Sequence, residues 1–185
     1  MGDQVFRVRP ATLADVGGIA RVHVESSDDA YAPLAAVWDA PDVAKRTADW
    51  REWLTAVQGN PQRVDLVAER AGEIIGFITV GRPRRKELGT ELEVYVIHVL
   101  PEHRGAGVGA RLWTEACDAL RGDELRSMYV ATLAELRCCS FYEARGGVLA
   151  EREPEDFHGG AVTSVVYTWA TGQPCAAPPR DASRS

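Results

Sequence analysis

The chain has 185 residues, of which 45% are hydrophobic and 26% charged, and its formal net charge is −6. These values are typical of one soluble globular domain, and no apolar run is long enough to cross a membrane. The acidic balance argues against nucleic acid as a partner, and the four cysteines lack the C-x-x-C spacing of a zinc site. We therefore expect a cytoplasmic protein with reduced thiols, no bound metal and no membrane partner.

Hydrophobic periodicity predicts one strand and two helices in the first third of the chain. The spacing of Thr12 and Asp15 is similar to a capping box, and Gly59-Asn60-Pro61 is a typical helix stop. The predicted elements are a strand at Val5–Arg9, a helix from Thr12 to Val24, an irregular segment at Ser26–Ala36 and a helix from Asp42 to Val57.

The rest of the chain alternates between strand and helix patterns. A hairpin of Arg63–Glu69 and Glu73–Val80, turning at Ala71-Gly72, precedes a basic loop that reads as a solvated connection. The later predicted elements are a helix at Gly107–Arg121, a strand at Ser127–Leu133, a helix at Ala134–Ala144 and strands at Val148–Arg152 and Ala161–Trp169. Because residues 171–185 are rich in Pro, Ala and Ser, we expect one domain over residues 1–170 and a disordered tail.

The most informative segment is Leu92–Leu112. A run of β-branched residues ends at Pro101, and the loop Gly105-Ala106-Gly107-Val108-Gly109 then leads into a helical pattern. Glycines allow close approach to the backbone, and the N–H groups and dipole at the start of a helix favour negative charge. The order strand, glycine loop, helix therefore predicts a phosphate-binding loop.

Three kinds of phosphate loop compete for this segment. A P-loop is excluded because no Gly-Lys-Ser/Thr follows the glycines. A dinucleotide fingerprint fits Gly105, Gly107 and Ala110, but four residues separate the strand from the glycines and about a hundred residues precede it. The string from Val99 to Gly109 resembles, at every defined position, V-x-P-x-x-R/Q-G-x-G-x-G/A, the pyrophosphate loop of the GNAT N-acetyltransferase superfamily.

A second motif supports the same resemblance. The segment Ser140–Gly147 looks like the family's F-Y-E-x-x-G-F string, with Gly147 where an aromatic residue is usual. The order of the predicted elements from Val5 to Trp169 is also similar to the GNAT fold. The resemblance implies an α/β (α+β) fold with a mixed, mostly antiparallel central sheet flanked by helices.

The resemblance implies that acetyl-CoA is the acyl donor. The backbone of Ile97, His98 and Val99 is expected to pair with the pantetheine arm as an added strand would. The pyrophosphate is expected at Arg104, Gly105, Ala106, Gly107, Val108, Gly109 and Ala110. Glu135 stands where family members often carry Asn, and a carboxylate cannot donate the hydrogen bond that the amide gives.

Three side chains are candidates for proton transfer. Strand alternation puts Glu91, Glu93, Tyr95 and Ile97 on one face, and the resemblance favours Glu93, then Glu91, as general base. Tyr142 matches the family's general acid, and a phenol stays protonated at neutral pH. The alternatives are solvated carboxylates at a strand end and an aromatic ring packed under the cofactor.

The segment after the first helix has the position that shapes the acceptor pocket in the family. Asp28, Asp29 and Tyr31 are therefore candidates to meet a cationic or aromatic amine. The resemblance implies transfer of an acetyl group to a primary amine, chiefly of a small molecule, by direct attack in a ternary complex. The alternatives are a protein N-terminal or lysine acetyltransferase and a non-catalytic acyl-CoA-binding or sensor domain. A homodimer is a further expectation from the family.

Overall fold

A computed structural model describes residues 6–38, 42–120 and 126–172, and the predicted tail from residue 173 onward lies outside them. These residues form one seven-stranded sheet in the order β1-β2-β3-β4-β5-β7-β6. The strands are β1 (Arg7–Pro10), β2 (Val64–Arg70), β3 (Glu73–Gly81), β4 (Leu92–Val99), β5 (Met128–Leu133), β6 (Val148–Phe157) and β7 (Gly160–Trp169). The helices are α1 (Val16–Tyr31), α2 (Val43–Ala56), α3 (Val108–Leu120) and α4 (Cys139–Glu143).

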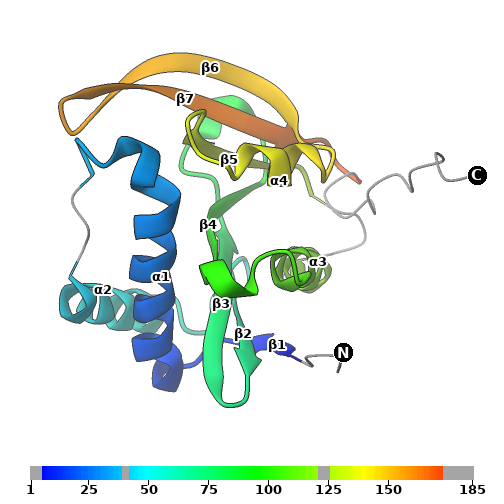
Figure 1. The fold of residues 1–185 in the computed structure, drawn as a ribbon. Coiled ribbons are helices and arrows are strands. Elements are labelled where there is room, and N and C mark those ends of the chain that lie inside the picture. Colours follow the sequence, from blue (N-terminus) through cyan, green and yellow to red (C-terminus); the bar gives the residue numbers. More distant parts are fainter. Residues whose placement is uncertain (1–5, 39–41, 121–125, 173–185) are drawn as a thin grey trace, which may run out of the picture.

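The helices cover both faces of the sheet. Figure 1 shows α1 and α2 on one side of β3 and β4, and α3 on the other. Every residue of β3 except Glu73 is consequently buried. Each strand pairs antiparallel with its neighbours except β4 and β5, which run parallel. The expected fold, a mixed and mostly antiparallel sheet flanked by helices, is confirmed.

The predicted hairpin and second helix are also confirmed. Ala71 and Gly72 connect β2 to β3 with φ angles of 51° and 85°, as a two-residue hairpin turn requires. Asp42 caps α2 by accepting a hydrogen bond from the Lys45 backbone nitrogen at 2.9 Å. These elements were predicted correctly because turn residues and helix caps act locally and can be recognised in the sequence.

Three predicted elements have different extents in the structure. The segment predicted to be irregular from Ser26 continues α1 to Tyr31, with the Ser26 hydroxyl donating to the Val22 carbonyl inside the helix. The predicted helix 134–144 is only the short α4, preceded by turns. The strand β6 runs to Phe157 and not to Arg152, because an edge strand tolerates Pro154.

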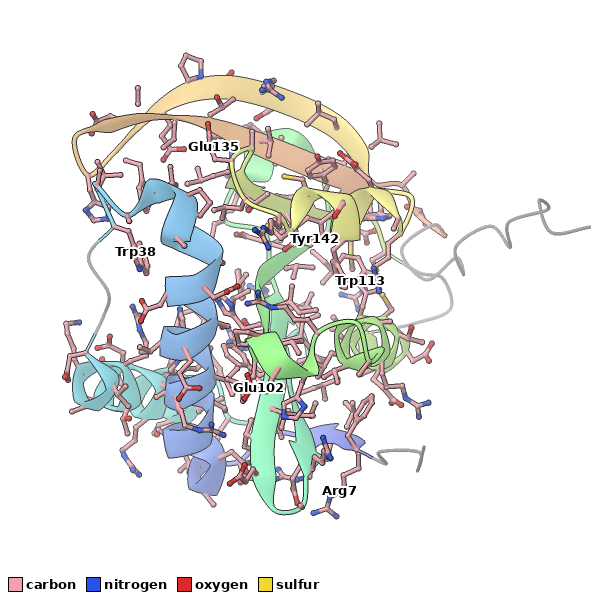
Figure 2. All side chains as sticks on the ribbon, viewed as in Figure 1. Arg7, Trp38, Glu102, Trp113, Glu135 and Tyr142 are labelled. Carbon is pink, nitrogen blue, oxygen red and sulfur yellow. The ribbon has the colours of Figure 1, made fainter. Side chains whose placement is uncertain are left out.

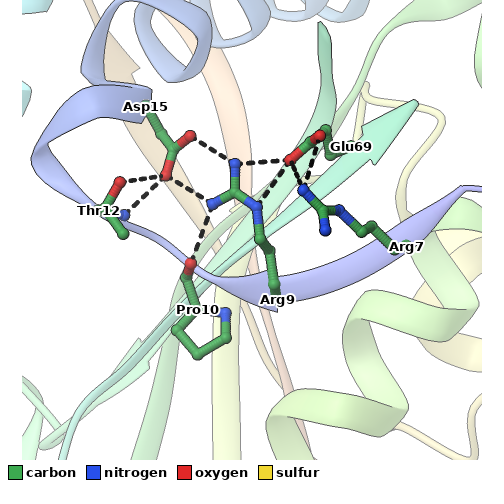
Figure 3. A network of polar contacts seen from close by, with 6 residues as sticks. All are labelled: Arg7, Arg9, Pro10, Thr12, Asp15 and Glu69. Atoms are coloured by element: carbon green, nitrogen blue, oxygen red, sulfur yellow. Dashed lines mark hydrogen bonds and ion pairs between the residues drawn. The ribbon is translucent and has the colours of Figure 1, made fainter. Parts of the chain in front are cut away.

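A polar network fixes β1 to its surroundings (Figure 3). The guanidinium of Arg9 donates to both oxygens of Asp15 at 2.7 Å and to Glu69 on β2, also at 2.7 Å. Asp15 also accepts a hydrogen bond from the Thr12 backbone nitrogen at 2.8 Å, which confirms that half of the predicted capping box. The hydrogen bonds from Arg9 are the main reason that the pKa of Asp15 falls to about 2.

The strand β4 divides from β5 soon after the two meet. Parallel pairing covers only Leu92 with Met128 and Glu93 with Tyr129, so the later part of β4 has no strand partner on that edge. A β-bulge also inserts Tyr95 between the residues that pair with Val80 and Thr79 of β3. Because the extra residue shifts the alternation of side chains, the assumption of one shared face for Glu93 and Ile97 is wrong.

Candidate active site

A cavity of about 540 Å³ opens where β4 and β5 divide. Its walls come from the end of α1, the later half of β4, the start of α3, the middle of β5 and the segment around α4. Most of the lining is apolar, and the charged residues that line it are Asp29, Arg104, Arg137 and Arg145. The predicted glycine loop and Tyr142, the predicted general acid, are far apart in sequence but border the same cavity.

The glycine loop forms one end of this cavity. Gly105 and Gly107 have φ angles of 76° and 81°, and no heavy atom lies within 4 Å of the position that a Cβ would take at either residue. The Arg111 backbone nitrogen donates to the Gly107 carbonyl at 3.0 Å, so the amides before it have no acceptor inside α3. Open space and unpaired amides at a helix N-terminus are what an oxyanion requires.

Arg104 ties the glycine loop to α1. Its Nε donates to the Val99 carbonyl at 3.1 Å, its Nη2 donates to the Ser26 carbonyl at 3.3 Å, and Nη1 forms an ion pair with Asp29. Both residues line the cavity. This agrees with the predicted placement of Arg104 near the pyrophosphate and of Asp29 near the acceptor amine. Their charges are already paired, so Asp29 is a weaker partner for a cationic amine than its type suggests.

The other two acceptor candidates have different surroundings. Tyr31 lines the cavity and stacks on Trp38, with ring centroids 4.2 Å apart. Asp28 accepts a hydrogen bond from the Trp38 indole nitrogen at 3.1 Å and is not among the lining residues. Phe157, at the tip of the β6–β7 hairpin, extends the stack with its centroid 5.7 Å from that of Tyr31. Of these three rings, only that of Tyr31 belongs to a residue that lines the cavity.

Tyr142 lines the cavity from α4. Its side chain is 5% exposed, and burial raises the pKa of its phenol well above 10. Figure 2 shows Tyr142 on α4 with Trp113 of α3 below it, and their ring centroids are 6.2 Å apart. The hydroxyl makes no hydrogen bond to any residue in the described part of the chain. A phenol held this way is neutral at physiological pH and free to donate.

The missing aromatic of the second motif also has an explanation. A Cβ at Gly147 would come within 2.7 Å of the Trp169 ring and 2.9 Å of the Tyr142 carbonyl. Trp169 itself is 1% exposed and packs 4.9 Å from Trp113, centroid to centroid. A tryptophan from β7 therefore occupies the space beside Gly147, so that position must stay small.

Glu93 does not border the cavity. It is 2% exposed, and its carboxylate accepts hydrogen bonds from the Arg84 backbone nitrogen at 2.7 Å and from Arg84 Nε at 2.8 Å. The loop interpreted as solvated thus supplies the counter-ion of a buried carboxylate. Glu91 is exposed and accepts a hydrogen bond from the Ser127 backbone nitrogen at 3.2 Å. The role of either carboxylate as base stays a prediction.

The sequence predicted a role for the backbone of His98 but none for its side chain or for His23. His98 lines the cavity, and its imidazole lies 4.9 Å from that of His23, centroid to centroid. Burial lowers the pKa of His98 to about 3 and that of His23 to about 4. The Trp50 indole nitrogen donates to His23 Nδ1 at 3.1 Å. A sequence gives no signal for this pair, because the two residues are 75 positions apart.

Glu135 turns away from the cavity. Its carboxylate accepts a hydrogen bond from the Thr163 backbone nitrogen on β7 at 3.0 Å, and Figure 2 shows it beside that strand. Cys138, three residues later, does line the cavity. Over residues 6–38, 42–120 and 126–172, no helix is long and apolar enough to cross a membrane, and no three metal-ligating side chains gather.

Comparisons with known proteins agree with this geometry. A model described as the acetyltransferase (GNAT) family matches residues 25–147, about two thirds of the chain. The chain is 27% identical over 150 residues to the uncharacterized N-acetyltransferase YuaI of Bacillus subtilis, covering 80% of this chain and 82% of that protein. It is 29% identical over 126 residues to an L-methionine sulfoximine/L-methionine sulfone acetyltransferase of Pseudomonas aeruginosa, covering 67% and 69% of the two chains.

Solved structures have the same fold. The protein yncA of Salmonella typhimurium, solved with its cofactor acetyl-CoA, superposes with a TM-score of 0.63 at 22% identity, and the match covers 94% of this chain and 97% of that one. The PaiA N-acetyltransferase of Thermoplasma acidophilum, solved with coenzyme A, gives a TM-score of 0.63 at 15% identity and covers 89% and 99%.

Proposed function

Because the chain belongs to the acetyltransferase (GNAT) family, we propose that it transfers an acetyl group from acetyl-CoA to the primary amine of a small molecule. The observation that carries the proposal is the cavity where β4 and β5 divide, bordered by open glycine amides at one end and by Tyr142 on the wall. The relative that acts on methionine sulfoximine, a small amine, supports the choice of acceptor class.

The fit of acetyl-CoA rests on two features of the chain. The later half of β4 pairs with β3 on one edge only, so Ile97, His98 and Val99 leave backbone groups for the pantetheine amides on the other. The amides from Gly105 to Ala110 are suited to the pyrophosphate, since the glycines leave that space open. Bound there, acetyl-CoA supplies the thioester that the amine attacks.

Tyr142 is proposed as the general acid. The departing sulfur of coenzyme A gains negative charge, and a neutral phenol within the same cavity can donate a proton to it. Burial keeps the pKa of Tyr142 above its ordinary value, so the proton is present at any physiological pH. The side chain therefore acts on the leaving group and not on the attacking amine.

Removal of the amine proton is proposed to involve Glu93, with Glu91 as second choice. In this structure the charge of Glu93 is paired with that of Arg84. To accept the amine proton, Glu93 would need a bridging water and a rearrangement of this ion pair. A second route needs no side chain at all, because the small neutral fraction of the amine can attack directly. We therefore expect Glu93 to affect the rate less than Tyr142.

The test is a screen of free amino acids, polyamines and aromatic amines, with release of the coenzyme A thiol as the signal. One acceptor class with saturable turnover, and initial-rate lines that intersect, is the expected result for direct attack in a ternary complex. Turnover only on peptide N-termini or lysine side chains would instead favour a protein acetyltransferase. Binding of acetyl-CoA without turnover on any acceptor would favour a sensor domain. The cytoplasmic location and the homodimer stay predictions.

A further inference from the structure

Two arginines on the cavity wall lack a carboxylate partner among the described residues. Of the charged residues lining the cavity, Arg104 is paired with Asp29, whereas Arg137 and Arg145 form no such ion pair. Arg137 is exposed to solvent, which screens its charge, but Arg145 is only partly exposed. A partly buried cation without a counter-ion is costly unless another anion approaches it.

Arg145 is nevertheless held in one place. Its guanidinium carbon lies 3.5 Å from the centroid of the Phe141 ring, and its Nη1 donates to the Phe141 carbonyl at 2.9 Å. The Trp169 indole nitrogen donates to the Arg145 carbonyl at 2.8 Å and fixes the backbone as well. Within the described part of the chain, Nε and Nη2 donate to no residue, so two donors of the planar fork remain available.

The neighbours of Arg145 connect it to the glycine loop. The edge of the Phe141 ring lies 3.0 Å from the position of a Cβ at Gly109, in the first turn of α3. Phe141 thus contacts both the guanidinium and the first turn of α3, where the open amides lie. A fixed cation and a row of free amides that share this aromatic neighbour form a surface for a ligand with more than one anionic group.

From this arrangement we infer that Arg145 binds a phosphate group at the nucleotide end of coenzyme A. The inference rests on the proposed function, since it takes acetyl-CoA as the donor. Coenzyme A carries a pyrophosphate and a 3′-phosphate, and both offer the planar pair of oxygens that a guanidinium binds. Arg145 is then a binding residue for the donor and takes no part in proton transfer.

The test compares calorimetric titrations of acetyl-CoA and acetyl-3′-dephospho-CoA into three proteins. These are the wild type, Arg145→Gln and the control Arg51→Gln, which removes an exposed arginine of α2 that does not line the cavity. Arg145→Gln is expected to weaken acetyl-CoA binding roughly tenfold or more, as the loss of a charge-assisted pair does, and Arg51→Gln to leave it unchanged. Arg145→Lys, which keeps the charge, is expected to lose less.

The two ligands separate the two phosphates. A loss seen with acetyl-CoA but not with the dephospho compound assigns Arg145 to the 3′-phosphate, and an equal loss with both assigns it to the pyrophosphate. Turnover of acetyl-pantetheine, which has neither group, is expected to be the same in wild type and variant. Unchanged acetyl-CoA affinity in Arg145→Gln, or an equal loss with acetyl-pantetheine, would overturn the inference, whereas wild-type binding together with turnover would still uphold the proposed function. Failure of the wild type to bind would remove both.

Discussion

The two sides of the cavity are built in different ways. The donor side, formed by the later half of β4 and residues 104–110, uses mainly backbone groups and glycines with positive φ. The acceptor side, formed by the end of α1 from Asp29 to Tyr31, uses side-chain contacts such as the ion pair of Arg104 with Asp29 and the stacking of Tyr31 on Trp38. Backbone geometry follows from a short motif, whereas paired side chains depend on contacts across the fold. The donor side is therefore the more predictable one.

The largest effect is expected on the donor side. Gly107→Glu puts a negative charge and a side chain into the open space at the start of α3, and should lower kcat/KM for acetyl-CoA by roughly a thousandfold, since the phosphate loses its amides and meets a like charge. Steady-state kinetics measure the loss. Gly17→Glu, an exposed position in α1 with no atom within 4 Å of its Cβ, makes the same change elsewhere and should retain activity. Equal losses in both variants would contradict the loop's role.

Tyr142→Phe should have the next largest effect and should act on kcat. Removing the hydroxyl leaves the ring in its buried place but takes away the donated proton, which is worth about a hundredfold in general acid catalysis. KM for acetyl-CoA should stay within about threefold, because the phenol adds little to ground-state binding. A variant with unchanged kcat would mean that the ring only packs beside the cofactor.

The proposed base, which lies outside the cavity, is tested with Glu93→Gln. If Glu93 takes the amine proton, kcat should fall roughly tenfold and the rate should rise more steeply toward alkaline pH, as solvent replaces the base. The matched variant is Arg84→Gln, which removes the same ion pair but leaves the carboxylate. Both changes should lower the melting temperature, Arg84→Gln by more, because it leaves the buried Glu93 carboxylate without its counter-ion, whereas the Arg84 side chain is 67% exposed. If both variants lose stability but keep the wild-type pH profile, the pair is structural.

The smallest kinetic effect is expected far from both sides, at the network of Arg9 and Asp15. Asp15→Asn should leave kcat/KM unchanged but lower the free energy of unfolding by about 1 kcal/mol at neutral pH, since solvent screens part of the pair. The pKa of Asp15 is depressed to about 2, so its contribution is present above the unfolded value near 4 and is lost as pH falls toward 2. In denaturation experiments, the difference in stability between wild type and variant should therefore narrow from pH 7 to pH 3. A constant difference would contradict the assignment.

The sequence predicted the fold class, the hairpin and the position of the glycine loop, because turns, caps and glycine spacing act locally. It missed the bulge at Tyr95, which depends on the register between β3 and β4. This bulge puts Glu93 on the opposite face of the strand from Ile97. It also missed the counter-ion role of Arg84, since a run of basic residues in a loop looks the same whether or not it covers a buried carboxylate. Contacts between segments far apart in the chain, such as these, were the part of the structure that the sequence predicted least well.

The most direct measurement is calorimetric titration of acetyl-CoA and, separately, NADH into the purified protein. A phosphate loop that follows a divided β4 and β5 should bind acetyl-CoA saturably with one site per chain, and NADH weakly or not at all. Tight binding of NADH, or no binding of acetyl-CoA, would contradict the assignment of the glycine loop and every site role that depends on it.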